Sequence, residues 1–346
     1  MPATYEIILK NGKCFINGEL KSVDVGISKG IIKNIGEIKE ESAEKTLDLK
    51  NLIVLPGVID TQVHFREPGQ PEKETIGSGS RAAAAGGVTS FLDMPNNKPA
   101  ATSLAAMQAK LDSSAATAVT NYGFFIGATP TNIADLQEAV GTPDAPSPTD
   151  GICGIKVFMG SSTGDLLVHQ QEHLENIFAN TGGIIAVHAE DEDRLNARWP
   201  EFKDRTDIAA HAEWRDYECA MIATKRATAL AKEFNHKLHV LHLTTGVEAD
   251  WLAQNKGDLV TTEVCPQHLN LTIPECYEKL GTYAQMNPPI RDKSHYDRLW
   301  YGVKNNLNDT IGSDHAPHLK INKEKEYPNS PSGMPGVQTL IPLMLN

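Results

Sequence analysis

Five residues combine metal-binding side chains with one kind of position, the end of an apolar, β-rich run. They are His64, Lys156, His188, His242 and Asp314. Imidazole nitrogens and carboxylate oxygens together suit Zn²⁺ or a similar divalent cation that keeps coordination positions open for water. A single histidine at a strand end is usually a hydrogen-bonded structural residue, and a lone lysine can extend its ammonium group into water. The coincidence of five such residues indicates a metal-dependent catalytic site.

The first apolar run ends in the sequence DTQVHFR, residues 60–66. Side chains of a strand alternate between its two faces, so Gln62, His64 and Arg66 share one face. We therefore expect an amide, an imidazole and a guanidinium to point together toward the candidate site. Six other histidines are expected to be surface or structural residues: His169, His211, His236, His239, His268 and His295.

Eight apolar runs predict the strands that position these residues: 53–64, 88–94, 122–127, 152–159, 183–188, 238–243, 259–264 and 310–314. Helical segments are expected between them, among others at 78–85, 104–118, 211–234 and 295–306. This alternation predicts a parallel α/β architecture, and eight is the strand number of the TIM (β/α)8 barrel. The nearly continuous apolar character fits strands that are buried on both faces. Active sites of such barrels lie at the C-terminal strand ends, where the five residues fall.

The first 52 residues follow a different pattern. Short strands punctuated by Asn11-Gly12 and Asn17-Gly18 predict hairpins, and no helix is expected before Ile53. We predict a small β-domain over residues 1–52 and the barrel over residues 53–346. The stretch 319–336 has a charged middle that is not expected to pack in a core, and we predict that it forms a mobile lid over the site.

The composition excludes several classes of function. The chain has 346 residues, with 32 Lys and Arg against 44 Asp and Glu, which gives a formal net charge of −12. An acidic balance of this size argues against a nucleic-acid partner, which requires clustered basic residues. Five scattered cysteines without a Cys-x-x-Cys pair indicate a reduced protein rather than a disulfide scaffold. Since no leader is visible and no apolar run approaches the roughly 18 residues of a membrane span, we expect a cytoplasmic protein without membrane association.

Several motifs together resemble those of class I dihydroorotases in the amidohydrolase superfamily. They are GVID (57–60), HFREPG (64–69), AAGGVT (84–89), DMPN (93–96), VHAE (187–190), HVLH (239–242), MNPP (286–289) and SDHAPH (313–318). The resemblance covers essentially the whole chain, and the combination is far more specific than any single motif. It implies a zinc-dependent (β/α)8 barrel that interconverts N-carbamoyl-L-aspartate and L-dihydroorotate in de novo pyrimidine synthesis.

The resemblance implies a role for each of the five residues. His64 would bind one metal ion, and His188 and His242 would bind the second, so that one or two Zn²⁺ ions are expected per chain. Lys156 would bridge the ions after N-carboxylation by CO₂. A lysine near divalent cations is driven to its neutral amine, which can capture CO₂. Asp314 would ligate the first metal and act as the general acid and base.

The resemblance also implies how a small-molecule substrate is held. A guanidinium and two neutral donors resemble the family's clamp for a substrate carboxylate: Arg66, Asn96 and His318. A side chain and a short stretch of backbone resemble its contacts to the ring amide: Asn287, with Ser332 and Gly333.

Two features depart from the family pattern. The family has His-x-His on strand one, and here Gln62 replaces the first histidine. An amide oxygen is a weaker zinc ligand than imidazole, so the role of Gln62 as a ligand stays open. Family chains also generally continue further and return strands to the N-terminal β unit. We therefore expect a partial β-sandwich whose C-terminal half is absent, and a barrel whose closing segment is short or missing.

Two alternative functions remain at this stage. Hydantoinases (dihydropyrimidinases) and allantoinases share the metal residues, but their substrates lack the carboxylate that Arg66 would bind. A catalytically inactive homologue could instead serve as a scaffold for aspartate transcarbamoylase. Gln62 and the short C-terminus favour this scaffold, whereas retention of the metal residues and Arg66 opposes it. A homodimer and an association with aspartate transcarbamoylase both stay open.

Overall fold

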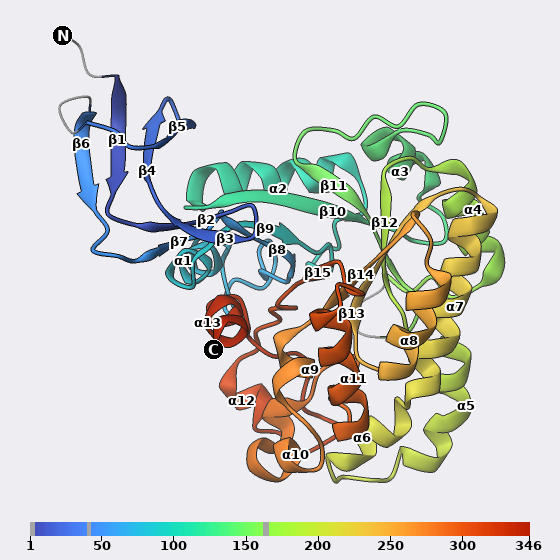
Figure 1. Cartoon of the computed structure of the whole chain (residues 1–346). Helices are drawn as coiled ribbons and strands as arrows, with labels where there is room; N and C mark the ends of the chain where they lie inside the picture. Colours follow the sequence, from blue (N-terminus) through green and yellow to red (C-terminus); the bar gives the residue numbers. More distant parts are fainter. Residues whose placement is uncertain (1–3, 40–42, 162–165) are drawn as a thin grey trace. The chain divides into compact units, whose positions relative to one another are not determined.

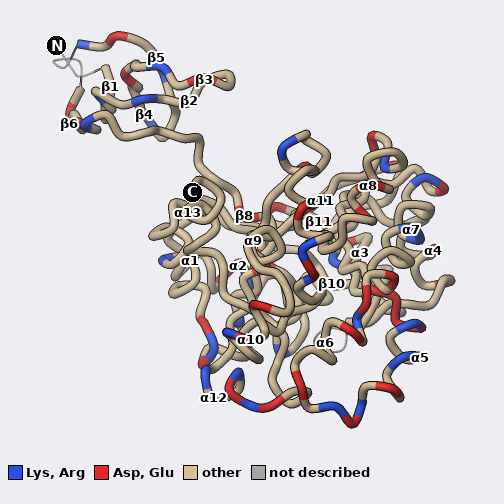
Figure 2. Tube along the Cα trace, turned by 60° about the horizontal axis from the view of Figure 1, so that its bottom comes forward, with Lys and Arg blue, Asp and Glu red and all other residues tan. Residues whose placement is uncertain are grey.

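The computed structural model describes residues 4–39, 43–161 and 166–346. The chain divides into two compact units, Met1–Val58 and Ile59–Asn346, and each is described by itself. Among the described residues, no helix is both long and apolar enough to cross a membrane. Lys and Arg alternate with Asp and Glu along outer helices such as α5 (Figure 2).

The N-terminal unit consists of two small sheets and contains no helix in its described residues (Figure 1). One sheet has the strand order β5-β4-β1-β6, and the other has the order β3-β2-β7. The strands are β1 (Tyr5–Lys10), β2 (Lys13–Ile16), β3 (Glu19–Ser22), β4 (Asp24–Ser28), β5 (Ile31–Gly36), β6 (Ala43–Asp48) and β7 (Ile53–Val54).

Only one of the two Asn-Gly pairs forms a hairpin. Asn17 and Gly18 have φ values of 51° and 82° and join the antiparallel strands β2 and β3, as a tight two-residue turn requires. Asn11 also has a positive φ, but it connects β1 to a strand of the other sheet. The hairpin predicted at Asn11-Gly12 is therefore wrong, because β1 already pairs with β4 on one edge and β6 on the other.

The second unit is the predicted TIM barrel. In the described residues its eight strands follow the order β8 to β15. Neighbouring strands from β9 to β15 run parallel. The strands are β8 (Val58–Val63), β9 (Val88–Asp93), β10 (Asn121–Gly127), β11 (Ile152–Phe158), β12 (Ile184–His188), β13 (Lys237–Leu243), β14 (Val260–Val264) and β15 (Thr310–Ile311). Figure 1 shows helices packed around the outside of this sheet.

The first and eighth strands are shorter than predicted. The run 53–64 is two strands, because β7 pairs with β2 in the N-terminal unit and only β8 enters the barrel. The eighth strand ends at Ile311, and Gly312 leaves the space that the Glu263 carboxyl occupies. The barrel closes beyond it, where the His64 amide donates to the His315 carbonyl over 2.7 Å.

The helices follow the predicted spacing, with one break. Residues 211–234 form two helices, because the chain turns at Arg215 and Asp216 then caps the second one by accepting from the Cys219 amide. The helices are α1 (Ile76–Ala85), α2 (Leu104–Thr117), α3 (Ile133–Val140), α4 (Gln171–Asn180), α5 (Glu192–Phe202), α6 (Ala209–Trp214), α7 (Tyr217–Glu233), α8 (Gly246–Asn255), α9 (Pro266–Asn270), α10 (Glu275–Leu280), the 3₁₀ helix η2 (Gly281–Ala284), α11 (Lys293–Lys304), α12 (Lys320–Lys323) and α13 (Leu340–Leu345).

The segment 319–336 is packed more firmly than its charge pattern suggests. Lys323 is only 5% exposed, and its ammonium group donates to the carbonyls of Gln285 and Pro331 over 3.0 and 2.9 Å. The Ser330 hydroxyl donates back to the Lys323 carbonyl. The expectation that the charged middle cannot pack in a core is therefore wrong for Lys323, whose ammonium group donates to two backbone carbonyls.

Candidate active site

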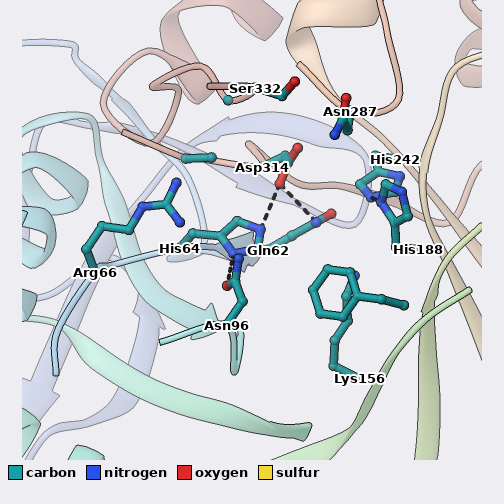
Figure 3. A pocket seen from close by; sticks show the side chains of 13 residues that line it. Gln62, His64, Arg66, Asn96, Lys156, His188, His242, Asn287, Asp314 and Ser332 are labelled. Atoms are coloured by element: carbon teal, nitrogen blue, oxygen red, sulfur yellow. Dashed lines mark hydrogen bonds and ion pairs between the residues drawn. The ribbon is translucent and has the colours of Figure 1, made fainter. Parts of the chain in front are cut away.

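A small cavity of about 30 Å³ opens at the C-terminal ends of the barrel strands (Figure 3). It collects every residue that the sequence proposed for the site except His318, which lies beside it. The lining residues are Gln62, His64, Arg66, Asn96, Lys156, Phe158, His188, His242, Asn287, Asp314, Ala316, Ser332 and Gly333.

One side of the cavity holds a histidine–carboxylate pair. His64 Nε2 lies 3.1 Å from Asp314 Oδ1, and its Nδ1 lies 2.6 Å from the amide oxygen of Asn96. Because that oxygen can only accept, Nδ1 carries a proton, and in the neutral ring the lone pair of Nε2 then faces the carboxylate. Two acceptors in contact define a place for a cation. Gln62 directs its amide nitrogen, at 3.0 Å, to the same carboxylate oxygen.

A histidine pair faces it from two neighbouring strands. His188 Nδ1 lies 3.0 Å from His242 Nε2, and His188 Nε2 lies 2.8 Å from Glu190 Oε2. The Glu190 carboxylate accepts the Nε2 proton, so the Nδ1 lone pair is directed at His242. Burial also lowers the pKa of both rings, which favours the neutral imidazole that a metal requires.

Lys156 reaches the cavity from β11 and has an unusual environment. Its side chain is fully buried, and its Nζ has no hydrogen-bond partner among the described residues. Burial lowers its pKa to about 7, although Asp314 and Glu263 favour the charged form. The Nζ lies 4.6 Å from the centre of the Phe158 ring. A large fraction of this amine is therefore neutral near neutral pH.

These residues fit a metal site that needs one further anionic ligand. Within the described part of the chain, no group of three or more His, Cys, Asp or Glu residues is arranged to hold a metal ion. The two pairs, His64 with Asp314 and His188 with His242, supply two ligands each. The ammonium form of Lys156 has no lone pair and its neutral amine has no negative charge, so this side chain would supply an anionic ligand only after carboxylation.

The position of Asp314 is fixed by its backbone neighbours. Asp314 and His242 have φ values of 44° and 37°, a region that residues other than glycine seldom adopt and that is often found at functional sites. Buried Asp60 accepts from the Ser313 amide over 2.9 Å and thereby holds the turn that carries Asp314. Burial raises the pKa of Asp60 to about 7.

A buried cation lies at the rim of the cavity. Arg66 is 4% exposed and donates through Nε to the Pro317 carbonyl over 3.1 Å. His318 Nε2 lies 3.3 Å from Arg66 Nη2 and 3.0 Å from the Ser332 carbonyl. Since the carbonyl only accepts, this nitrogen carries the proton and cannot also accept from Arg66. Burial and the neighbouring guanidinium lower the pKa of His318 to about 3, so the ring is neutral.

Gly333 brings its backbone close to the cavity. Its φ is 141°, and a Cβ atom at this position would lie 2.6 Å from the Ala316 carbonyl, so a larger residue cannot fit. The Gly333 amide donates to the Gln285 carbonyl, and the Gln285 side chain donates to the Ser332 hydroxyl. These bonds hold the Ser332–Gly333 backbone at the cavity that Asn287 also lines.

Sequence reasoning missed several residues that complete the site. Phe158 and Ala316 line the cavity, and Phe158 could be found from its two-residue spacing to Lys156 on β11. Arg215 lies between α6 and α7, pairs with Glu190 and also donates to the Ser161 carbonyl. Burial would raise the pKa of Glu190, but Arg215 and His188 outweigh it and lower the pKa to about 2. No sequence signal marks Arg215.

Comparisons with known proteins agree with this geometry. The model of the amidohydrolase family matches residues 53–334. A dihydroorotase of Methanosarcina mazei is 33% identical, over 98% of this chain and 75% of its own length, and an allantoinase of Solibacter usitatus is 31% identical over 98% and 74%. The L-hydantoinase structure from Arthrobacter aurescens superposes with a TM-score of 0.90 at 28% identity, over 99% of this chain and 77% of that one. Together with the barrel and its cavity, these matches show that the chain belongs to the amidohydrolase family.

Proposed function

We propose that this protein is a dihydroorotase, which interconverts N-carbamoyl-L-aspartate and L-dihydroorotate in de novo pyrimidine synthesis. The observation that carries the proposal is the buried guanidinium of Arg66 at the rim of a cavity that also holds two pairs of metal-binding side chains. In the part of the chain that the structure describes, no carboxylate forms an ion pair with Arg66, and such a buried cation suits a substrate that brings its own carboxylate. L-dihydroorotate has one, whereas hydantoin and allantoin do not.

The proposal includes one or two zinc ions per chain. His64 and Asp314 would hold the first ion, His188 and His242 the second, and N-carboxylated Lys156 would bridge them. Bound zinc would polarise the amide carbonyl and lower the pKa of a water molecule. Support comes from the ligand atoms themselves, because the two atoms of each pair lie 3.1 and 3.0 Å apart, a separation that two ligands of one cation can have. In addition, the buried Lys156 amine has no hydrogen-bond partner among the described residues.

The residues of the chain divide the remaining work. Asp314 would take a proton from the attacking water and return it to the leaving amide nitrogen, and it would do the reverse in ring closure. Gln62, which donates to one oxygen of Asp314, keeps that carboxylate oriented for the transfer. Arg66 would bind the substrate carboxylate together with the amide nitrogen of Asn96, and His318 would join them by turning its Nε2 proton from the Ser332 carbonyl to the substrate.

The ring amide would be held on the opposite side of the cavity. Asn287 offers both a carbonyl and an amide group, and the backbone of Ser332 and Gly333 passes beside it. Such neutral donors and acceptors match the N–H and C=O edge of a cyclic amide. The narrow cavity also limits the number of water molecules around the reacting bond.

The test is a panel of cyclic amides offered to the purified chain with zinc and bicarbonate. We expect hydrolysis of L-dihydroorotate and, in the reverse direction, ring closure of N-carbamoyl-L-aspartate. Faster hydrolysis of hydantoin or allantoin would reassign the chain to the activity named for its hydantoinase or allantoinase relatives. A chain that carries metal but turns over none of these compounds would contradict the proposal and favour a scaffold.

A further inference from the structure

The backbone that presents Asn287 to the cavity is held by two buried histidines that do not line the cavity. His211 Nε2 lies 2.9 Å from the Met286 carbonyl, and His268 Nε2 lies 3.1 Å from the Pro288 carbonyl. These carbonyls belong to the residues immediately before and after Asn287. The two histidines therefore hold the segment on both sides of the one side chain that it contributes to the cavity.

Both histidines must be neutral donors. A carbonyl oxygen only accepts, so each ring carries its proton on Nε2. The Nδ1 atoms of both rings are buried and have no hydrogen-bond partner among the described residues. His211 and His268 are only 2% and 3% exposed. Burial lowers the pKa of His211 to about 3 and that of His268 to about 4, which agrees with uncharged rings.

The two histidines come from parts of the fold that contribute nothing else to the cavity. His211 lies on α6, the short helix before the break at Arg215, and His268 lies on α9, directly after β14. The neighbour of His268 has a parallel contact, because Gln267 donates to the Ser313 carbonyl over 2.7 Å, next to Asp314. The residues that follow the seventh barrel strand thus hold backbone carbonyls next to Asp314 and Asn287.

We propose that His211 and His268 are positioning residues for substrate binding, which act by fixing the backbone on either side of Asn287. Loss of either donor leaves a buried carbonyl unsatisfied, and the segment shifts to find water or another donor. Asn287 then loses its alignment with the ring amide, while the pairs His64–Asp314 and His188–His242 stay in place. The defect is expected in substrate binding and not in metal binding.

The test replaces each histidine by leucine and by glutamine, whose amide nitrogen can replace Nε2 as a donor. We expect His211→Leu and His268→Leu to raise KM by about tenfold or more, as the loss of one buried hydrogen bond allows. The turnover number should change less, and the metal content should equal that of the wild type. The glutamine variants should recover most of the lost affinity. Asparagine, which is too short to reach the carbonyl, replaces leucine if a leucine variant does not fold.

His236 provides a matched control. Its Nε2 also bonds a buried backbone carbonyl, that of Thr181, over 2.9 Å, but it lies at the N-terminal ends of the barrel strands. Its Nδ1 also lies 2.9 Å from the Lys237 carbonyl, so His236→Leu should lower the melting temperature at least as much as the other leucine variants and leave KM unchanged. An equal rise of KM in His236→Leu would show a general loss of stability and would overturn the proposal, as would an unchanged KM in folded His211→Leu and His268→Leu.

A second readout separates this proposal from the proposed function. KM needs a cyclic amide that the wild type turns over, and so rests on that function, but amide hydrogen exchange does not. We expect faster exchange in residues 282–290 in His211→Leu and His268→Leu, with no such change in His236→Leu. Unchanged exchange in this segment would contradict the positioning role even if the substrate assignment is correct. Faster exchange in a chain that does not hydrolyse dihydroorotate would contradict only the assignment.

Discussion

Glu190 accepts a hydrogen bond from Nε2 of His188 over 2.8 Å and thereby decides which ring nitrogen faces the cavity. The opposite nitrogen, Nδ1, then points at His242 Nε2, 3.0 Å away. Arg215 holds Glu190 from behind, so a buried charge pair fixes the tautomer of a proposed metal ligand.

This relationship predicts that Glu190 controls metal affinity without being a ligand. Glu190→Gln should weaken zinc binding by about 10- to 100-fold, the usual effect of removing such an outer partner. Competition with a coloured chelator measures it directly. Glu248 is the matched control, because it is equally buried but accepts from the hydroxyls of Thr224 and Thr245. Glu248→Gln should keep the wild-type affinity, and equal weakening in both variants would refute the tautomer role.

The bridging role of Lys156 predicts loss of both metal and activity in Lys156→Ala. Each metal pair would then lack its shared anionic ligand, and acetate or propionate should partly restore metal content and turnover. Lys110 tests the specificity of the rescue, because it is also fully buried but pairs with Asp93 over 2.7 Å. Lys110→Met should lower the free energy of unfolding by about 3–5 kcal/mol, with no rescue by carboxylates. Full metal content in Lys156→Ala would exclude the bridge.

The buried guanidinium of Arg66 predicts that its replacement lowers activity only toward substrates with a carboxylate. Arg66→Met should lower kcat/KM for L-dihydroorotate at least tens-fold, because loss of a buried charge partner costs about 2–5 kcal/mol. Dihydrouracil, which lacks the carboxylate, should be hydrolysed at nearly the wild-type rate, however poor a substrate it is. Steady-state kinetics with both compounds decide the matter. A parallel loss for both substrates would make Arg66 a structural residue.

The presence of Gln62 in place of a histidine predicts that the two metal positions differ in affinity for zinc. Gln62 directs its nitrogen to Asp314, and its amide oxygen is a weaker zinc ligand than imidazole, so the first pair gains less from it than from a histidine. During stepwise dialysis against chelator, the metal at His64 and Asp314 should leave first. Gln62→His should raise the occupancy of that position and keep activity. Simultaneous loss of both ions, with no effect of Gln62→His, would show that the positions are equivalent.

Much of the barrel and the site could be predicted because both depend on short-range patterns. Apolar runs located the strands, and polar residues at their C-terminal ends located the cavity. The predicted strand and helix ends were wrong where an element contacts residues far away in the sequence. The eighth strand ends at Ile311, next to Gly312, whose lack of a side chain leaves room for the Glu263 carboxyl, and the predicted helix 211–234 is interrupted where Arg215 pairs with Glu190. Neither contact has a local signal.

The positioning residues escaped prediction for the same reason. The sequence around a helical histidine does not show whether the side chain faces water or a carbonyl elsewhere in the chain. His211 contacts a residue 75 positions away, and His268 one that is 20 positions away. Lys323 was expected on a charged loop, yet it is buried because two distant carbonyls accept from its ammonium group.

The most direct test of the account is the ratio of kcat/KM for L-dihydroorotate to kcat/KM for dihydrouracil in the wild-type chain loaded with zinc. The two rings differ only in the carboxylate that Arg66 is proposed to bind. We predict a ratio of at least about 30, since a buried charge pair contributes about 2 kcal/mol or more. A ratio of one or less would contradict the assignment as a dihydroorotase and would place the chain with enzymes that act on uncharged cyclic amides.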